Sequence, residues 1–308
     1  MKFRYLRVGT LLTTLGIVIQ VNAQDPFTNG LVAFYPFNGN ANDAIGANHG
    51  TVYGATLTEN RLVEPNKAFS FNGTNKVLAG DSVLPLGKSP RTISLWVKIP
   101  LSTNNPNEIV FNYGVQTTSQ ANWINVISKT GTPRTLGSVI FDFYNSGAIS
   151  TNTITFDAWQ HIVCTLDGSS VARIYINGTI AGADLVTANT TTSGVLNIGD
   201  GSGTAVNQAG VVGSIDDVRI YNRALSASEV KALYDYEAAP FVGLIKAVKP
   251  SFSNLKLTTN YQLQLSGDLN TWTNHGSPFT ATNTSMVYPQ YWDVDNWGGL
   301  FFRLQVSP

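Results

Sequence analysis

The stretch that decides the fold is WQHIVCTLDGSSVARIYINGTIAG, residues 159–182. Its first part, up to residue 166, alternates between the faces of an expected strand, and a second strand is expected at 173–176. Asn177-Gly178 follows at once, and this pair is the strongest short signal for a β-hairpin because a type I′ turn requires positive φ at both positions. The stretch therefore predicts a hairpin whose strands meet at Asn177-Gly178.

Similar short runs surround this hairpin. The run Thr92 to Ile99 places Ile93, Leu95 and Val97 on one face and Trp96 on the other, which is typical of a strand in the middle of a sheet. Many short strands separated by turns indicate an all-β sandwich or jelly roll. The other runs expected to form strands are 31–37, 68–71, 109–113, 123–128, 138–144, 194–198 and 211–221.

The composition excludes some classes of function. The chain has 19 basic and 19 acidic residues, and only 12% of its residues are charged. A chain without net positive charge or a Lys/Arg cluster lacks the attraction to phosphates that nucleic-acid binding requires. The single cysteine, Cys164, cannot form an internal disulfide, and in an apolar strand it is expected to behave as a small buried hydrophobe.

The N-terminus has the layout of a secretory signal peptide over residues 1–23. Basic residues precede an apolar run, 8–21, which ends in the small-residue triplet Val21-Asn22-Ala23. The alternative, a membrane anchor, is less favoured because the run falls short of the ~20 apolar residues that a spanning helix needs. We therefore expect cleavage after Ala23, a mature chain that begins at about Gln24, no transmembrane segment, and a secreted or cell-surface protein.

One helix and a second module follow the strands. Ser226 and Glu229 form a capping box, and Leu225 can pack on Val230, so a helix is expected from there to about Tyr236. Residues 238–240 have the character of a linker. The remainder, 238–308, contains the alternating run 261–265 and another expected strand at 300–306, which indicates a small β-rich C-terminal module.

Five blocks of the chain resemble one family. They are LVAFYPFNGNANDAIGANHGTVYGA (31–55), AFSFNGTNKV (68–77), TISLWVKI (92–99), the stretch at 159–182 and GSIDDVRIYNRALSASEVKALY (213–234). In this order they are similar to bacterial laminin-G-like, or concanavalin A-like lectin/glucanase, domains, and the resemblance covers residues 28–237. It implies a two-sheet antiparallel jelly roll, export, and frequently a structural calcium ion, but it leaves the function open.

The resemblance implies that the calcium ion would be shared by Asp43 and Asp216. Asp43 lies in a loop of small residues, and calcium prefers carboxylate and carbonyl oxygens on such loops. Alternation in a strand would send Asp216 and Asp217 to opposite faces. In the alternative interpretation Asp43 forms an Asx-turn and one aspartate of the pair binds Arg219 or Arg223.

Three aromatic residues near Asn-rich loops are candidates for binding a sugar, because aromatic rings beside amide groups are typical of such sites. They are Tyr113, Trp123 and Tyr144. The alternative is that they fill the core, as most aromatic residues of sandwiches do.

Catalysis is not expected from the sequence. None of the glutamates lies in the Glu-x-Asp-x-x-Glu pattern of the glucanase branch, and Glu229 is accounted for by the capping box. His161 is expected to be structural because no Ser/Asp partner motif accompanies it. We therefore expect a secreted, non-catalytic carbohydrate-binding or adhesion protein whose partner is a glycan or cell-surface polysaccharide. A diverged glycoside hydrolase and a structural surface scaffold are the alternatives.

Overall fold

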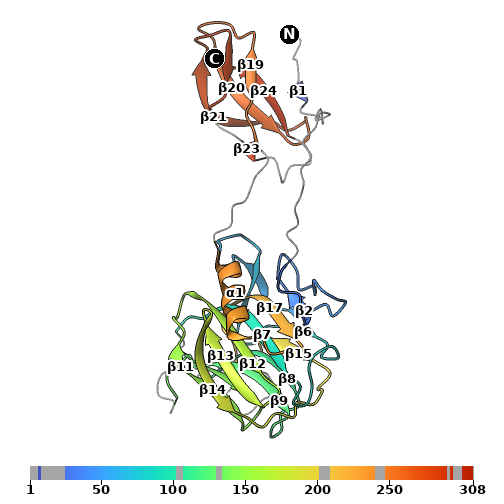
Figure 1. The fold of residues 1–308 in the computed structure, drawn as a ribbon. Helices are drawn as coiled ribbons and strands as arrows, with labels where there is room; N and C mark the ends of the chain where they lie inside the picture. Colours follow the sequence, from blue (N-terminus) through green and yellow to red (C-terminus); the bar gives the residue numbers. More distant parts are fainter. Residues whose placement is uncertain are drawn as a thin grey trace. The chain divides into compact units, whose positions relative to one another are not determined.

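The computed structural model describes residues 6–7, 25–101, 107–129, 134–200, 209–239, 247–289, 292–293 and 300–307. The chain divides into two compact units, one formed by residues 23–240 and the other by residues 1–22 with 241–308. The larger unit is a β-sandwich, and the smaller one is built mainly from the C-terminal strands (Figure 1).

The first sheet of the sandwich has the order β14-β13-β12-β7-β17-β5-β4, and β2 also pairs with β17. We call it the helix-covered sheet. All of its paired strands are antiparallel. Its strands are β2 (Leu31–Tyr35), β4 (Thr56–Thr58), β5 (Ala68–Asn72), β7 (Arg91–Lys98), β12 (Trp159–Leu166), β13 (Val171–Ile176), β14 (Thr179–Leu185) and β17 (Val212–Tyr221).

The second sheet has the order β11-β10-β9-β8-β15-β6-β3, and β16 pairs with β8 in the parallel direction. The expected two-sheet antiparallel sandwich is therefore confirmed, with this one short parallel pair as the exception among the described strands. Its strands are β3 (Thr51–Tyr53), β6 (Lys76–Ala79), β8 (Glu108–Gly114), β9 (Ala121–Val126), β10 (Ser138–Asp142), β11 (Gly147–Thr153), β15 (Leu196–Ile198) and β16 (Ala209–Gly210).

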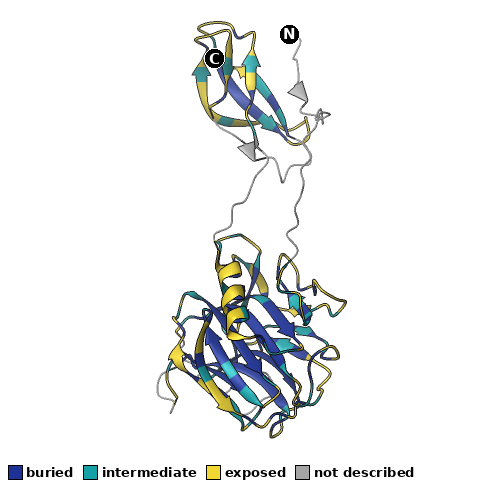
Figure 2. Ribbon diagram, in the orientation of Figure 1, coloured by how far each residue is buried: buried dark blue, intermediate teal, exposed yellow. Residues whose placement is uncertain are grey.

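The core lies between the two sheets. Leu95 and Ile162 belong to it on the helix-covered sheet, and Phe111 and Phe141 belong to it on the second sheet. Buried residues run along the strands of the sandwich, whereas much of the helix is exposed (Figure 2). Strand β7 lies between β12 and β17, which confirms the central position expected from its two apolar faces. Cys164 is fully buried here, and burial raises the pKa of its thiol, so this residue serves as a small core side chain.

The expected hairpin joins β13 to β14. Asn177 and Gly178 have φ of 50° and 74°, as a type I′ turn requires. A side chain at position 178 would meet Lys231 and Tyr234 at 3.0–3.1 Å, so the helix packs directly on this turn. Glycine therefore serves both the backbone conformation and the close approach of the helix.

Helix α1 (Ala227–Ala238) lies across the outside of the helix-covered sheet (Figure 1). Ser226 and Glu229 form both hydrogen bonds of the expected capping box. The buried side chains of α1 include Val230 and Leu233, which pack with Val163 on β12 in a cluster separate from the main core. The helix is thus held by its apolar side and continues two residues beyond the expected end.

The C-terminal strands form a sheet of order β1-β24-β20-β21 and two short pairs, β18-β23 and β19-β22. The strands expected at 261–265 and 300–306 are present with slightly different ends. Two small apolar clusters stabilise this unit, one around Leu263 and Phe302 and one around Leu255 and Tyr261. The bounds are β1 (Leu6–Arg7), β18 (Ala247–Val248), β19 (Ser251–Ser253), β20 (Asn260–Ser266), β21 (Thr273–Thr280), β22 (Ser285–Val287), β23 (Trp292–Asp293) and β24 (Phe301–Val306).

The expected signal peptide falls mostly outside the described residues. Within it the structure describes the backbone of 6–7, which pairs with Phe302 and Phe301 of β24. Cleavage after Ala23 therefore stays a prediction. Among the described helices, none is long and apolar enough to cross a membrane.

Candidate functional site

A buried charged cluster fastens α1 to the helix-covered sheet. The carboxylate of Glu237, near the end of α1, accepts hydrogen bonds from Arg219 Nε at 2.8 Å and from Trp96 Nε1 at 2.7 Å. Arg61 donates to the backbone oxygen of Glu237 at 2.9 Å, and its guanidinium lies 4.6 Å from the centre of the Trp96 ring. We call this set the clasp; it consists of Arg61, Trp96, Asp216, Asp217, Arg219 and Glu237.

Burial shifts the titration of the groups in and beside the clasp. It raises the pKa of Glu237 to about 7, and burial together with the charge of Asp217 raises the pKa of Asp216 to about 9. Burial, with Arg61 and Arg219 nearby, lowers the pKa of His161 to about 3, so this ring is neutral. His161 hydrogen-bonds Ser94 at 2.7 Å and stacks on Trp96, while its Nδ1 is buried without a partner, so the purely structural role expected for it stays a prediction.

The prediction that Asp216 and Asp217 point to opposite faces is wrong. Arg61 binds both carboxylates, at 3.0 Å for Asp216 and 2.8 Å for Asp217. The pairing of β17 with β7 shifts register between Asp216 and Arg219, and Asp217 has φ of 46°. This is a β-bulge, which inserts an extra residue and interrupts strict alternation.

The described residues do not fit a calcium ion shared by Asp43 and Asp216. Asp43 Oδ1 accepts the backbone N–H groups of Phe34 and Ile45, both at 3.0 Å. The bond to Ile45 is the Asx-turn of the alternative interpretation. Asp216 is bound by Arg61, and no group of three or more acidic, His or Cys side chains within the described ranges could hold a metal ion. Calcium binding stays a prediction for which these two carboxylates are poorly suited.

The outer face of the second sheet, which points away from the core, carries a different kind of site. Eight buried side-chain N or O atoms of the described residues lack a hydrogen-bond partner, and four of them belong to this face. We call these four residues the polar strip; they are Asn107, Trp123, Asn125 and Ser138. Their unpaired atoms are Asn107 Oδ1, Trp123 Nε1, Asn125 Oδ1 and Ser138 Oγ.

Strand pairing places these side chains on one face. Trp123 and Asn125 are two residues apart on β9, so they point the same way. Asn125 pairs with Ile140, and Ser138 is two residues before Ile140 on β10. Asn107 precedes β8, two residues before Ile109, which also pairs with Asn125. Four residue steps along the sheet separate the ends of the strip, which corresponds to roughly 13 Å.

Two of the three predicted sugar-binding aromatics meet at one end of the strip. Trp123 is 1% exposed, and its ring contacts that of Tyr144 edge-on at 5.6 Å. Tyr144 and Asn145 both have positive φ and form the turn between β10 and β11, which leaves Tyr144 partly exposed. Tyr144 is thus the one of these three residues that lies at the surface.

Tyr113 lies on the other face of β8. It is fully buried in the core, accepts a hydrogen bond from Arg91 at 3.0 Å and donates one to the backbone of Pro85 at 2.8 Å. Its ring has no exposed face on which a sugar could stack. The core-filling alternative therefore describes Tyr113.

Polar groups that are already paired border the strip. Asn197 donates to Asn112 at 3.2 Å, and Asn112 donates to the backbone of Asp200 at 2.6 Å. Lys76 forms an ion pair of 2.8 Å with Asp200. Asn107, Asp142, Tyr144 and Asn197 are partly exposed, so the border of the strip reaches solvent.

The sequence patterns did not predict Asn107, Asn125 and Ser138 as site residues. An asparagine in the middle of an apolar strand, as in ANWINV (121–126), is the signal that could have found one of them. Asparagine is uncommon in strand interiors and mostly exposed, so a buried one needs an explanation.

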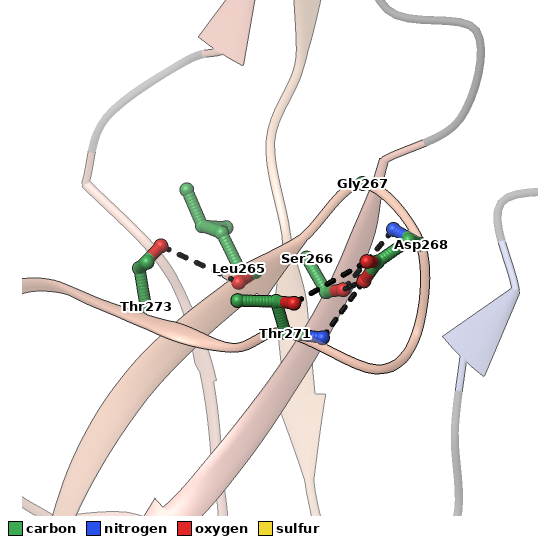
Figure 3. Close-up of a pocket in the computed structure, with 6 residues that line it drawn as sticks. All are labelled: Leu265, Ser266, Gly267, Asp268, Thr271 and Thr273. Atoms are coloured by element: carbon green, nitrogen blue, oxygen red, sulfur yellow. Dashed lines mark hydrogen bonds between the residues drawn. The ribbon is translucent and has the colours of Figure 1, made fainter.

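A pocket is also present in the C-terminal unit (Figure 3). It surrounds Asp268, which accepts backbone hydrogen bonds from Asn270 and Thr271 at 2.8 Å. These bonds lower the pKa of Asp268 to about 2 and identify it as the cap of a turn. The pocket offers no aromatic ring, and its central carboxylate is already satisfied. Its lining residues are Leu265, Ser266, Gly267, Asp268, Thr271 and Thr273.

Comparison with known proteins agrees with this architecture. The model of the family described as the concanavalin A-like lectin/glucanases superfamily matches residues 71–231, slightly more than half of the chain. A search of curated protein sequences found no significant match.

Several solved structures are similar in fold. The binding domain of botulinum neurotoxin serotype G has a TM-score of 0.51 at 16% identity, over 76% of this chain and 56% of that one. Botulinum neurotoxin type C, whose passage into cells depends on two ganglioside molecules, gives 0.51 at 14% identity, over 83% and 63%. This chain thus spans less than two thirds of either toxin structure. Domain 4 of an arabinanase from Geobacillus stearothermophilus, solved with arabinotriose, gives 0.48 at 23% identity, over 66% and 98%.

Proposed function

The chain belongs to the concanavalin A-like lectin/glucanases superfamily, and from this premise we propose that it is an exported, non-catalytic protein that binds glycans through the polar strip. The fold alone does not select this function, because one sandwich architecture hosts lectins, enzymes and scaffolds. The proposal therefore rests on the side chains of the strip.

The observation that carries the proposal is the set of four unpaired polar atoms on one face. Buried polar groups in folded proteins are nearly always hydrogen-bonded, so a cluster of unpaired ones indicates a ligand or ordered water. Trp123 Nε1 can only donate, whereas Asn107 Oδ1 and Asn125 Oδ1 can only accept. Sugar hydroxyls both donate and accept, but these atoms are buried, so a glycan could pair with them only after the side chains that cover them move aside.

The arrangement of carboxylates supports a non-catalytic role. Glycoside hydrolysis requires two carboxyl groups on either side of the bond that is cleaved. Asp142 and Asp200 lie beside the strip, but the buried Asp200 carboxylate is already bound by Lys76 at 2.8 Å. Glu108 points to the opposite face of β8, where Ser128 donates to it at 2.9 Å, so it cannot act together with Asp142 on one substrate.

Export and a role in adhesion complete the proposal. The signal-peptide pattern of residues 1–23 motivates export. Among proteins of similar fold, botulinum neurotoxin type C interacts with gangliosides, so a sandwich of this kind can serve recognition at a cell surface. We propose a glycan or cell-surface polysaccharide as the partner.

A glycan array probed with the full-length protein tests the proposal. We expect binding that falls at least about tenfold in Trp123→Phe, because this change removes the Nε1 donor but keeps an aromatic ring. Lys231→Gln, on the exposed side of α1, is the matched control and should bind as the wild type does. Absence of binding to every glycan, with the wild type folded by circular dichroism, would contradict the proposal and favour a scaffold.

A further inference from the structure

We infer that the C-terminal unit carries a second binding site, on the outer face of strands β21, β20 and β24, and that this site takes glycans which carry a carboxylate. The outer face is the one opposite the two apolar clusters of the unit. The site is separate from the polar strip, so the inference goes beyond the proposed function. Three observations support it: a chain of hydrogen bonds with a fixed direction, an arginine without a counter-ion, and the exposure of both ends of the chain.

Strand pairing places Asn274, Gln264 and Arg303 in one row across this face. Gln264 on β20 pairs with Asn274 on β21 and with Arg303 on β24. Leu263 and Leu265, on either side of Gln264, belong to an apolar cluster, so alternation along the strand turns Gln264 to the outer face. The row crosses two strand spacings, which corresponds to roughly 10 Å.

The hydrogen bonds of this row have only one possible direction. Arg303 Nε can only donate, so Gln264 Oε1 accepts from it at 2.7 Å. The other end of the Gln264 amide is then its NH2 group, which donates to Asn274 Oδ1 at 2.7 Å. Because Oδ1 of Asn274 is the acceptor, its Nδ2 group is the one that remains for a ligand. The row therefore ends in N–H donors on both sides and favours a ligand that is rich in acceptors.

Arg303 is a cation without a counter-ion among the residues that the structure describes. Its Nε is bound to Gln264, and its guanidinium lies 4.2 Å from the centre of the Trp272 ring. Within the described ranges no carboxylate forms an ion pair with it. Asp268, in the loop before Trp272, accepts backbone N–H groups of its own turn instead. The two terminal amino groups of Arg303 therefore remain for a carboxylate, which a planar guanidinium binds through two parallel hydrogen bonds.

Both ends of the row lie at the surface, unlike the buried atoms of the polar strip. Asn274 is exposed and Arg303 is partly exposed, whereas Gln264 between them is 8% exposed. Trp272, also partly exposed, adds an aromatic ring beside the cation. An acidic sugar offers a carboxylate for Arg303 and hydroxyl oxygens for the neutral amide of Asn274, together with a ring that can contact the indole. This combination favours an acidic glycan over an acidic peptide.

The test uses the full-length protein and an array that presents uronic acid and sialic acid chains, each beside its methyl ester. The ester removes the charge and keeps the rest of the chain. In at least one pair the free acid should bind at least about tenfold more tightly at low salt, because a hydrogen-bonded charge pair contributes about that factor. The preference should shrink as the salt concentration rises, since Arg303 is partly exposed. A glutamate-rich peptide is the third probe and should bind more weakly than the acidic glycan.

Three substitutions that each make the net charge more negative by one sharpen the test. Arg303→Gln removes the cation and should abolish the preference for the acid. Asn274→Asp keeps the oxygen that accepts from Gln264 but replaces the donor with a charged oxygen, so it should abolish the preference while changing only an exposed side chain. Lys256→Gln removes an exposed cation from the loop between β19 and β20 and should leave the preference unchanged.

The outcomes separate this inference from the proposed function, which depends on Trp123. A preference that persists in both Arg303→Gln and Asn274→Asp would overturn the inference, as would equal binding of every acid and its ester, or a peptide that binds as tightly as the glycan. If no acid is preferred but glycan binding falls in Trp123→Phe, the second site is overturned and the proposed function stands. If the preference depends on Arg303 and Trp123→Phe affects no glycan, the second site is supported and the role of the strip is contradicted.

Discussion

The two outer faces of the sandwich both bury polar side chains, but they differ in how these side chains are paired. On the helix-covered sheet, the clasp is charged and buried, and Glu237 finds partners in Arg219 and Trp96. On the second sheet, the polar strip is uncharged and buried except at Asn107, and Trp123 Nε1 and Asn125 Oδ1 have no partner. The clasp residues are paired with one another, although His161 Nδ1, Thr165 Oγ1 and Tyr221 Oη on the same sheet are buried without a partner. The strip residues each keep one unpaired atom.

This difference separates a structural site from a binding site. Perturbed pKa values often mark functional sites, and here the pKa values of Asp216 and His161, in and beside the clasp, are strongly perturbed. Ion-pair networks that serve structure perturb pKa values equally well. Four of the eight buried unpaired atoms of the described residues gather in the strip, and this grouping is what distinguishes it from the clasp.

The largest expected effect comes from breaking the clasp. Arg219→Met should destabilise the sandwich by about 3–5 kcal/mol, because it leaves the buried carboxylate of Glu237 without its cation. Urea denaturation followed by tryptophan fluorescence measures the change. Arg173→Met is the matched control, since its ion pair with Asp167 is about one third exposed and should contribute less than ~1 kcal/mol. Equal losses in the two variants would show that the clasp is no stronger than a surface pair.

The second prediction concerns Glu108. Unlike Glu237, which is bound by Arg219, Glu108 has only uncharged donors, Ser128 and the backbone N–H of Val212. Burial raises the pKa of Glu108 from 4.5 to about 7, so the folded state holds this proton more tightly than the unfolded chain does. Its contribution to stability is therefore complete below pH ~4.5 and is lost as the pH rises to about 7.

The substitution Glu108→Gln introduces a side chain that stays uncharged at every pH. It should therefore lessen the pH dependence of the unfolding free energy. The difference in unfolding free energy between pH 4.5 and 7 should shrink by up to about 3 kcal/mol relative to the wild type. Denaturation curves at several pH values decide this. Parallel pH profiles for both proteins would mean that Glu108 is ionised in the fold.

The third prediction compares two buried serines. Ser138→Ala should stabilise the protein by about 1 kcal/mol, because the hydroxyl of Ser138 is buried without a partner. Ser94→Ala should destabilise it by about 1 kcal/mol or more, because Ser94 hydrogen-bonds His161 at 2.7 Å. Thermal unfolding of both variants without glycan measures the pair. If Ser138→Ala destabilises as well, ordered water already satisfies the strip and its unused capacity is smaller than we infer.

The smallest expected effect concerns calcium. Chelation should leave the melting temperature unchanged, because backbone N–H groups and Arg61 occupy the oxygens of Asp43 and Asp216. Asp43→Asn should lower it to the same extent with calcium and with chelator. A wild-type melting temperature that drops by several degrees on chelation would restore the calcium clasp implied by the family resemblance.

Local sequence signals determined much of the fold. Asn177-Gly178 adopts the type I′ turn because few other pairs tolerate two positive φ values. Ser226 and Glu229 cap α1 through bonds that span three residues. The two apolar faces of β7 placed it in the middle of a sheet. In each case the deciding interaction is local, or the pattern of burial repeats with the period of the strand.

Tertiary structure alone decided the sites. Arg61 reaches Asp216 across 155 residues of sequence, and the bulge that turns Asp217 to the same cation interrupts the alternation that strand periodicity would predict. Whether Asn125 is satisfied depends on what the neighbouring strands β8 and β10 place beside it, which its own sequence context does not encode. Hydrogen-bond satisfaction is a property of the assembled sheet, so only the folded chain could distinguish the completed clasp from the unpaired strip.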